Sequence, residues 1–413
     1  MIKILLLSYV FFVSWTGVFA LGEWIRLPFI FALLSVALVS IDIVIKGKFD
    51  RRPYRMEDFF IVLFLISMVL SATCNPNALS LNYIAAYCFI FGVLYLFIKN
   101  ALYTYVPVDS IYAINSFAVV FVGAFMSINF VLGTMGVIDL QAMLPRIRDT
   151  TAMYSGLFNR GYGFSTEPSI VAFYIDTLGP LAVWYIWYRS GLQQYLKFIL
   201  TVFIAIGWLV TFSASAVASL TIGIVCAVLL SLLTPGKTRF WSDARFRTFL
   251  LLAVFIAIMI WIFFQFNLGK YLAPIYMKLT LSSDLASSSS RLDRWAAGFN
   301  RLVEVDNPLT GYGPGYFSSI DQSSTLSWYF MVLVEGGILS FLFIMIFLGL
   351  VLGRIVKMRH SSRPAFLVGF IAGCAHLLVI STFYHPFLWL LLAILYVQLA
   401  VLQKQAVIKS VEN

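Results

Sequence analysis

Long apolar runs follow one another along nearly the whole chain, separated by short polar connectors. A helix needs about 20 apolar residues to cross a hydrocarbon core about 30 Å thick, and most of these runs approach that length. The pattern therefore predicts twelve membrane-spanning helices, at residues 2–21, 27–45, 59–73, 83–98, 111–133, 169–188, 198–212, 216–233, 248–266, 326–352, 365–383 and 386–402.

Two parts of this pattern allow a second interpretation. The stretch 198–233 is almost uninterrupted, but as one helix it would be about 54 Å long, more than one crossing requires. We therefore place a turn at 213–215 and expect two short spans. The first run could instead be a signal peptide, because Lys3 precedes it and residues 18–20 resemble a cleavage site. Its apolar part is long for a signal peptide, which favours a retained span.

The composition indicates a membrane protein. Apolar residues make up 61 % of the 413 residues and charged residues only 11 %. A soluble or disordered chain of this size could not keep so much apolar surface from water with so few charges. The four cysteines are scattered, mostly inside apolar runs, which fits neither a disulfide framework nor a metal cluster. We expect an all-α integral membrane protein that forms one polytopic domain over residues 1–413.

The basic residues predict how the helices are oriented. The net charge is +10, but Lys and Arg lie in the connectors and form no nucleic-acid-binding motif, so we expect no nucleic-acid partner. With the N-terminus inside, the short connectors obey the positive-inside rule. Both termini are then cytoplasmic, two long external loops cover residues 134–168 and 267–325, and no Lys or Arg falls inside a span.

The connectors on the cytoplasmic side are short and contain no glycine-rich phosphate loop, so we expect the chemistry in the external loops. In loop 134–168, Pro168 fits the first position of the next helix, which makes Glu167 its N-cap. One interpretation of Glu167 is a carboxylate that complements the helix dipole. The other is a base held at the membrane surface by a rigid turn.

The main external loop, 267–325, contains a second group of charged residues. A helix over 291–303 would place Arg291, Arg294 and Arg301 on roughly one face. These arginines could clamp a diphosphate, because guanidinium groups match phosphate oxygens and stay charged when desolvated. Alternatively they touch lipid headgroups or pair with the nearby acids Asp293, Glu304 and Asp306.

Four short motifs occur in an order that resembles a known family. The segment that begins at Arg160 reads R-x-x-G-F-x-x-E-P-S, and residues 290–295 read S-R-x-x-x-W. Residues 308–317 read P-L-T-G-Y-G-P-G-Y-F, and E-G-G-I begins at Glu335. Together they resemble the signatures of bacterial O-antigen and capsule polymerases (Wzy type), within the wider group of O-antigen polymerases and ligases, with one spacer shortened.

The resemblance implies a GT-C-like membrane glycosyltransferase that needs no metal or other cofactor. It would lie in the bacterial inner membrane with its active site on the periplasmic face. Its substrates would be oligosaccharides linked to undecaprenyl diphosphate. The growing glycan leaves its lipid diphosphate and joins the non-reducing-end sugar of a new lipid-linked repeat. A chain-length regulator protein is a further implied partner.

The resemblance also implies roles for individual residues. Arg160 and Arg291 would neutralise the diphosphate leaving group, with Arg294 and Arg301 as further candidates. Glu167 is the best-placed base for the acceptor hydroxyl, since proton abstraction requires a carboxylate or His within hydrogen-bond reach. The rival bases are Asp293, Asp321 and His385, and the supporting residues are Glu335, Tyr312, Gly313 and Gly315.

Two other functions stay open. An O-antigen ligase shares the arginine loops but transfers the glycan to lipid A core. Ligases of this group commonly carry a His shortly before the E-G-G span, and residues 321–328 contain none. A flippase for lipid-linked oligosaccharides would be expected to carry cations inside its spans and to show repeated halves, and the sequence suggests neither.

Overall fold

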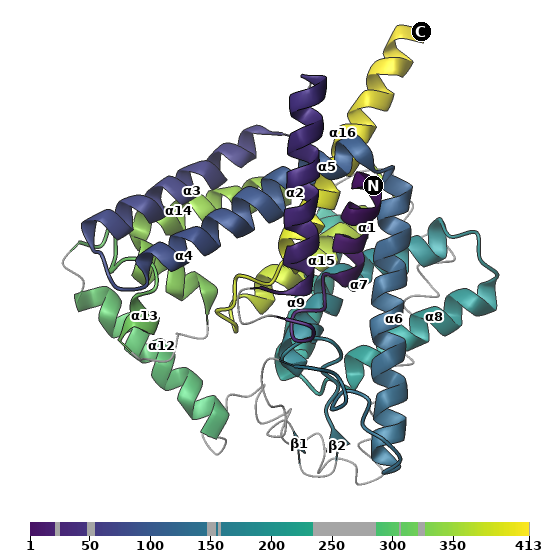
Figure 1. Ribbon diagram of the computed structural model, residues 1–413, viewed down its shortest axis with the longest axis horizontal. Coiled ribbons are helices and arrows are strands. Elements are labelled where there is room, and N and C mark those ends of the chain that lie inside the picture. The colour runs from purple at the N-terminus through teal and green to yellow at the C-terminus, as the bar shows by residue number, and fades with distance from the viewer. Residues whose placement is uncertain are drawn as a thin grey trace.

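The computed structural model is built almost entirely of helices (Figure 1). It describes residues 1–20, 25–47, 54–146, 154–155, 158–233, 286–304, 307–320 and 327–412. Eight described helices are long and apolar enough to cross a membrane: α2 (Leu27–Lys46), α3 (Met56–Cys74), the continuous helix α4–η1–α5 (Ser80–Tyr105), α6 (Val108–Thr134), α7 (Pro168–Tyr188), α9 (Ala214–Leu233), α14 (Trp328–Lys357) and α16 (Phe387–Glu412). The protein is therefore an all-α, multi-pass membrane protein.

The remaining elements complete the described chain. They are the helices α1 (Ile2–Phe12), α8 (Gln194–Leu209), α12 (Ala286–Glu304), α13 (Tyr316–Ser319) and α15 (Arg363–His376), and the antiparallel strands β1 (Tyr154–Ser155) and β2 (Phe158–Asn159). Figure 1 shows both chain ends in the upper half of the view and the β1–β2 hairpin at the bottom.

Eight of the twelve predicted spans correspond to helices long enough to cross a membrane, whereas the spans 2–21, 198–212 and 365–383 correspond to the shorter helices α1, α8 and α15. The predicted turn at 213–215 is confirmed to within a few residues, because α8 ends at Leu209 and α9 begins at Ala214. The predicted helix over 291–303 lies inside α12. The predicted span 248–266 lies outside the described residues.

The first predicted span, 2–21, is wrong in its length. Helix α1 ends at Phe12, and the chain then turns to pack against the segment before α7. The Gly17 N–H donates to the Phe164 carbonyl at 2.9 Å, and a Cβ on Gly17 would lie 2.5 Å from the Ser165 carbonyl carbon. The turn is as apolar as the helix before it, so hydropathy could not separate the two.

Lys99 lies within a helix counted among the candidate spans, although the sequence placed it just outside a span. The helix α4–η1–α5 continues past the predicted end at residue 98, and Lys99 is fully buried in it. Its ammonium donates to Asp58 at 2.6 Å and lies 4.6–4.9 Å from the ring centres of Tyr54, Tyr95 and Tyr396. The carboxylate and the aromatic faces compensate the buried charge.

Small residues allow the central helices to approach closely. Gly207 of α8 faces Gly123 of α6, and a Cβ on Gly207 would lie 2.5 Å from the Gly123 Cα. Gly369 of α15 is similarly pressed against the Thr177 carbonyl of α7. Helices in lipid associate through such contacts, because lipid tails supply no hydrophobic driving force between them.

Candidate functional site

The segment 160–167 connects β2 to α7 and is tied to the turn between α8 and α9. The Arg160 guanidinium donates through Nε to the Thr211 carbonyl at 3.1 Å and through Nη2 to the Phe212 carbonyl at 3.2 Å. The Gly161 N–H donates to the Val210 carbonyl at 2.7 Å. A guanidinium has five N–H donors, so Arg160 keeps donors beyond these two bonds.

Glu167 is the N-cap residue of α7, as predicted, with an extended backbone and Pro168 at the first helical position. Its side chain makes no capping hydrogen bond and is exposed. Ser169 Oγ donates to this carboxylate at 3.4 Å, near the limit for a hydrogen bond. The Glu167 carboxylate is therefore accessible and does not bind the helix N–H groups.

Arg160 and Glu167 lie within electrostatic range of each other. Burial lowers the pKa of the Arg160 guanidinium, and the negative charge of Glu167 acts in the opposite direction. The segment thus presents a half-buried cation and an exposed anion at the start of one helix.

Arg146 holds this segment in place, and the sequence analysis missed it. Its guanidinium donates to the carbonyls of Gln141, Gly163 and Ser165 at 3.0, 2.5 and 2.7 Å and lies 4.3 Å from the centre of the Tyr162 ring. Burial lowers the pKa of Arg146. The only signal in the sequence was its location in a predicted external loop, which does not distinguish a structural arginine from one that binds substrate.

A series of hydrogen bonds links Asp176 of α7 to the turn between α8 and α9. Asp176 Oδ1 accepts a hydrogen bond from Trp208 Nε1 at 2.7 Å, and the Trp208 carbonyl accepts one from Thr211 Oγ1 at 2.8 Å. Because the Thr211 carbonyl holds Arg160, three hydrogen bonds connect Asp176 to Arg160. The second carboxylate oxygen lies 3.3 Å from His376 Nδ1, which gives this carboxylate in a span a partner on each side.

The glycine loop, residues 308–317, is seated on a break in α14. Gly337 has φ 74° and ψ 179°, which interrupts the helix. The carbonyls of Val334 and Glu335 therefore lack their usual partners and accept hydrogen bonds from the N–H groups of Tyr312 (3.0 Å) and Gly313 (2.9 Å). The backbone of the loop thus replaces the missing turn of helix.

The Glu335 side chain also binds the glycine loop. Its two carboxylate oxygens accept hydrogen bonds from the N–H groups of Gly315 at 3.0 Å and Phe317 at 3.2 Å. Tyr312 stacks on Tyr316 with ring centres 4.4 Å apart. The structure thus brings together the four predicted supporting residues, Glu335, Tyr312, Gly313 and Gly315, in one structural unit.

The described arginines of α12 are less constrained. Arg294 is half-buried. Arg301 lies 3.4 Å from Glu304, with side chains 37 % and 61 % exposed, and a partly exposed ion pair of this kind contributes little. The structure describes the backbone of Arg291 within α12 but not its side chain. Asp321 lies outside the described residues. That the α12 arginines bind the same diphosphate as Arg160 stays a prediction.

His385 lies in the connection between α15 and α16 and is only 1 % exposed. Neither ring nitrogen has a hydrogen-bond partner in the part of the chain that the structure describes. Burial lowers the pKa of the imidazole well below its usual value, and Arg26 acts in the same direction. A neutral ring can accept a proton, but its burial makes it a poorer base for a sugar hydroxyl than Glu167.

The described side chains include no group of three His, Cys, Asp or Glu residues placed to hold a metal ion. No protein-family model and no curated protein matches this chain. The geometry around Arg160 and Glu167, together with the motifs, is therefore what supports a function.

Proposed function

We propose that the protein is a surface-polysaccharide polymerase. It transfers a growing glycan from undecaprenyl diphosphate to the non-reducing-end sugar of a new lipid-linked repeat unit. The observation that carries this proposal is the exposed Glu167 carboxylate, which lies at the start of a membrane-spanning helix in the same segment as Arg160. A base and a cation at a helix end would meet the reacting groups of a lipid-linked substrate at the membrane surface.

In the proposed reaction, the Glu167 carboxylate takes the proton of the acceptor hydroxyl while that oxygen bonds to the anomeric carbon of the donor glycan. The bond from this carbon to the diphosphate oxygen breaks, and its electron pair leaves with undecaprenyl diphosphate. Arg160 stabilises the negative charge that develops on the leaving group, using the guanidinium donors that Thr211 and Phe212 leave available. No cofactor is needed.

The rigidity of the segment supports this assignment of roles. Arg146 binds three backbone carbonyls, and the Gln141 side chain accepts hydrogen bonds from the N–H groups of Tyr162 and Gly163 at 2.8 and 2.7 Å. A site whose groups are held in place before the substrate binds loses less free energy in ordering them during the reaction.

The arginines of α12 are assigned to the same leaving group. Arg291 and Arg294 would contact the second phosphate of the diphosphate. A guanidinium group suits this role because it can donate two parallel hydrogen bonds to two oxygens of one phosphate. Arg301 ranks below them, since its charge is shared with Glu304.

Lys99 does not by itself favour a flippase, although it is a cation inside a span. Its ammonium is enclosed by Asp58 and three tyrosine rings. A transport cavity would instead require a cation directed at the lipid-linked substrate.

Lipopolysaccharide from a strain that lacks the gene, separated on a gel, distinguishes the three functions. Core carrying a single repeat supports the polymerase. Bare core supports the ligase, and bare core with lipid-linked repeats trapped in the cytoplasmic leaflet supports the flippase. The proposed inner-membrane location and periplasmic site predict that a Cys74→Ser, Thr166→Cys variant reacts with a membrane-impermeant maleimide in intact spheroplasts, whereas Cys74→Ser alone does not. A chain-length regulator, the proposed partner, should alter polymer length without being needed for polymerisation.

A further inference from the structure

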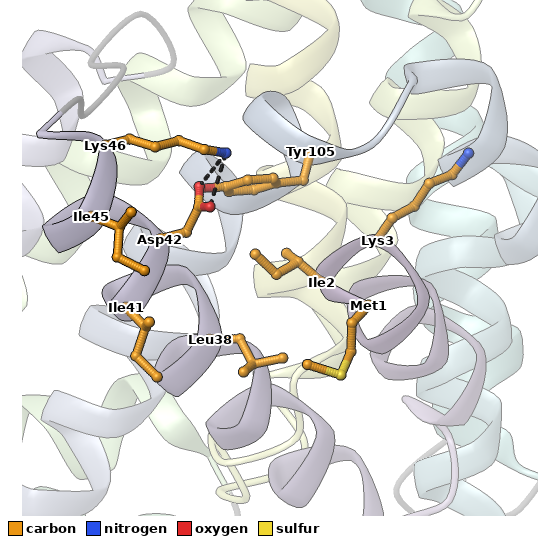
Figure 2. Close-up of a pocket in the computed structure, with 9 residues that line it drawn as sticks. All are labelled: Met1, Ile2, Lys3, Leu38, Ile41, Asp42, Ile45, Lys46 and Tyr105. Atoms are coloured by element: carbon orange, nitrogen blue, oxygen red, sulfur yellow. Dashed lines mark hydrogen bonds and ion pairs between the residues drawn. The ribbon is translucent and has the colours of Figure 1, made fainter.

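Helix α12 exposes large apolar side chains, although it is not one of the eight described helices that could cross a membrane. Such exposure is ordinary on a span, because lipid covers it: Ile41 and Ile45 of α2, drawn in Figure 2, are 54 % and 76 % exposed. On α12, Phe299 and Val303 are 55 % and 72 % exposed. They are four residues apart and therefore lie on the same side of the helix. No residue that the structure describes covers this apolar face.

Another side of α12 rests on the protein. Gly298 is buried, and Arg294 and Arg301, four residues before it and three after it, are only partly exposed. The helix packs against α14. A helix with an uncovered apolar face and cations along a neighbouring side has the form of a helix that lies in a membrane interface.

The break in α14 marks the level of a membrane surface. Beyond the break the helix continues for about 20 residues and about 30 Å, the thickness of a hydrocarbon core. Arg354 and Lys357 in its last turn mark the opposite surface. Helix α3 ends at the level of the break, because its C-cap residue, Asn75, donates to the Gly311 carbonyl of the glycine loop at 2.6 Å. The glycine loop therefore lies where these two spans leave the lipid.

Helix α12 is held close to this level. Only residues 305–307 separate Glu304 from Pro308, the first residue of the glycine loop, so the end of α12 lies within about 15 Å of the loop. The Pro308 carbonyl accepts a hydrogen bond from the Ile338 N–H at 2.9 Å, which places the start of the loop beside the first turn of α14 after the break. An exposed apolar face of α14 begins there, formed by Ile338, Leu342 and Met345.

We propose that α12 lies in the membrane interface beside α14, with Phe299 and Val303 among the acyl chains of the lipid leaflet on the side of the glycine loop. Lipid is the occupant that the surroundings favour, because it also covers the neighbouring apolar face of α14. Burial of the two side chains in the acyl region holds α12 in the interface. Arg294 and Arg301 then lie at the level of the lipid headgroups, where their charges reach water and phosphate. The inference does not depend on the proposed glycosyl transfer.

Spin labels measure what surrounds these two side chains. In a variant whose four cysteines are replaced by serine, Phe299→Cys or Val303→Cys is labelled with a nitroxide and reconstituted into vesicles of phosphatidylethanolamine and phosphatidylglycerol. A nitroxide in lipid collides often with dissolved oxygen and rarely with a water-soluble nickel chelate. We expect the accessibility to oxygen to exceed that to nickel several-fold at both positions, as it should at Leu342→Cys on the lipid-facing side of α14.

Ala297→Cys is the matched control on the same helix. Ala297 is exposed and, two residues before Phe299, lies on roughly the opposite side of α12, so its label should be more accessible to nickel than to oxygen. A Phe299→Cys label that the nickel chelate reaches readily would show that the apolar face meets water. A label that neither reagent reaches would show that protein covers this face, and either result would overturn the proposal.

Photolabelling of the wild-type chain checks the result without any substitution. A hydrophobic diazirine that partitions into the lipid should attach to residues 295–303, as well as to the lipid-facing part of α14. Labelling of α14 without labelling of residues 295–303 would contradict an interfacial α12.

Discussion

The Glu335 carboxylate accepts a hydrogen bond from the backbone N–H of Gly315 at 3.0 Å, across 20 residues of sequence. Gly315 has φ 84°, and a Cβ there would lie 2.8 Å from the Tyr83 ring, so both the backbone conformation and the space require glycine. The acidic residue of the E-G-G motif and the glycine loop are thus halves of one unit. Their observed role is structural, and catalysis is assigned elsewhere.

Glu335→Gln should destabilise the protein. Glutamine offers one acceptor oxygen, so one of the two buried N–H groups would face the amide nitrogen and stay unsatisfied, at a cost of about 1–3 kcal/mol. We expect a lower unfolding temperature in detergent and less protein in the membrane. Glu304→Gln, at an exposed position on α12, is the control and should leave both unchanged. An unfolding temperature equal to that of the wild type would contradict the structural role.

Trp208→Phe should make the Arg160 guanidinium less firmly held, although Trp208 does not contact Arg160. The substitution keeps an aromatic ring but removes the hydrogen bond to Asp176, which anchors the turn that holds the guanidinium. We expect Arg160 to react several-fold faster with a dicarbonyl reagent, measured by peptide mass spectrometry, while Arg294 reacts at its wild-type rate. Trp187→Phe removes a comparable bond, to Thr201 at 3.0 Å, away from the turn. Equal labelling in the two variants would argue against the connection.

His385 should make the protein less stable in acid. Its folded-state pKa lies well below the ordinary value of about 6.5, so below that pH the unfolded chain binds more protons than the folded one. Stability then falls as the pH falls, by up to about 1.4 kcal/mol per pH unit for one group. The charges of Arg26 and His376 act in the same direction. Unfolding temperatures at pH 7.5 and 5.5 should differ less in His385→Phe than in the wild type; equal differences would contradict this.

Arg160→Lys should reduce polymer while the protein level stays normal. Lysine keeps the charge but loses the planar, five-donor fork that lets a guanidinium bind two carbonyls and still present N–H groups to a phosphate. Arg160→Ala should be more severe. Arg189→Lys is the matched control, because its ion pair with Asp109 is exposed and weak, and it should leave polymer close to the wild-type level. Polymer gels and immunoblots of the same membranes measure both quantities, and full polymer in Arg160→Ala would exclude a role at the leaving group.

Apolar runs predicted the helical, membrane-spanning character because a bilayer imposes length and hydropathy on each crossing. The same reasoning failed where other forces decide. The turn after Phe12 is set by contacts with the segment before α7, and the burial of Lys99 is set by Asp58, which lies on a different helix. Such contacts depend on how the helices pack, and the hydropathy of a single run carries no information about them.

The candidate site was predictable only in part. Pro168 placed Glu167 at a helix start, because proline and cap preferences are local. The roles of Arg146 and Trp208 depend on backbone carbonyls brought close by folding, and those carbonyls have no signature in the sequence. The binding of the glycine loop to α14 likewise depends on the break at Gly337, which a composition pattern cannot reveal.

The general-base role of Glu167 is the central claim, and the rate of Glu167→Gln tests it most directly. Purified wild-type and variant proteins are given a synthetic undecaprenyl-diphosphate-linked repeat in the presence of EDTA. Because Glu167 makes no capping hydrogen bond, the variant should fold and accumulate normally. Loss of a general base should lower the polymerisation rate about a hundred- to ten-thousand-fold, whereas polymerisation at close to the wild-type rate would show that the base lies elsewhere.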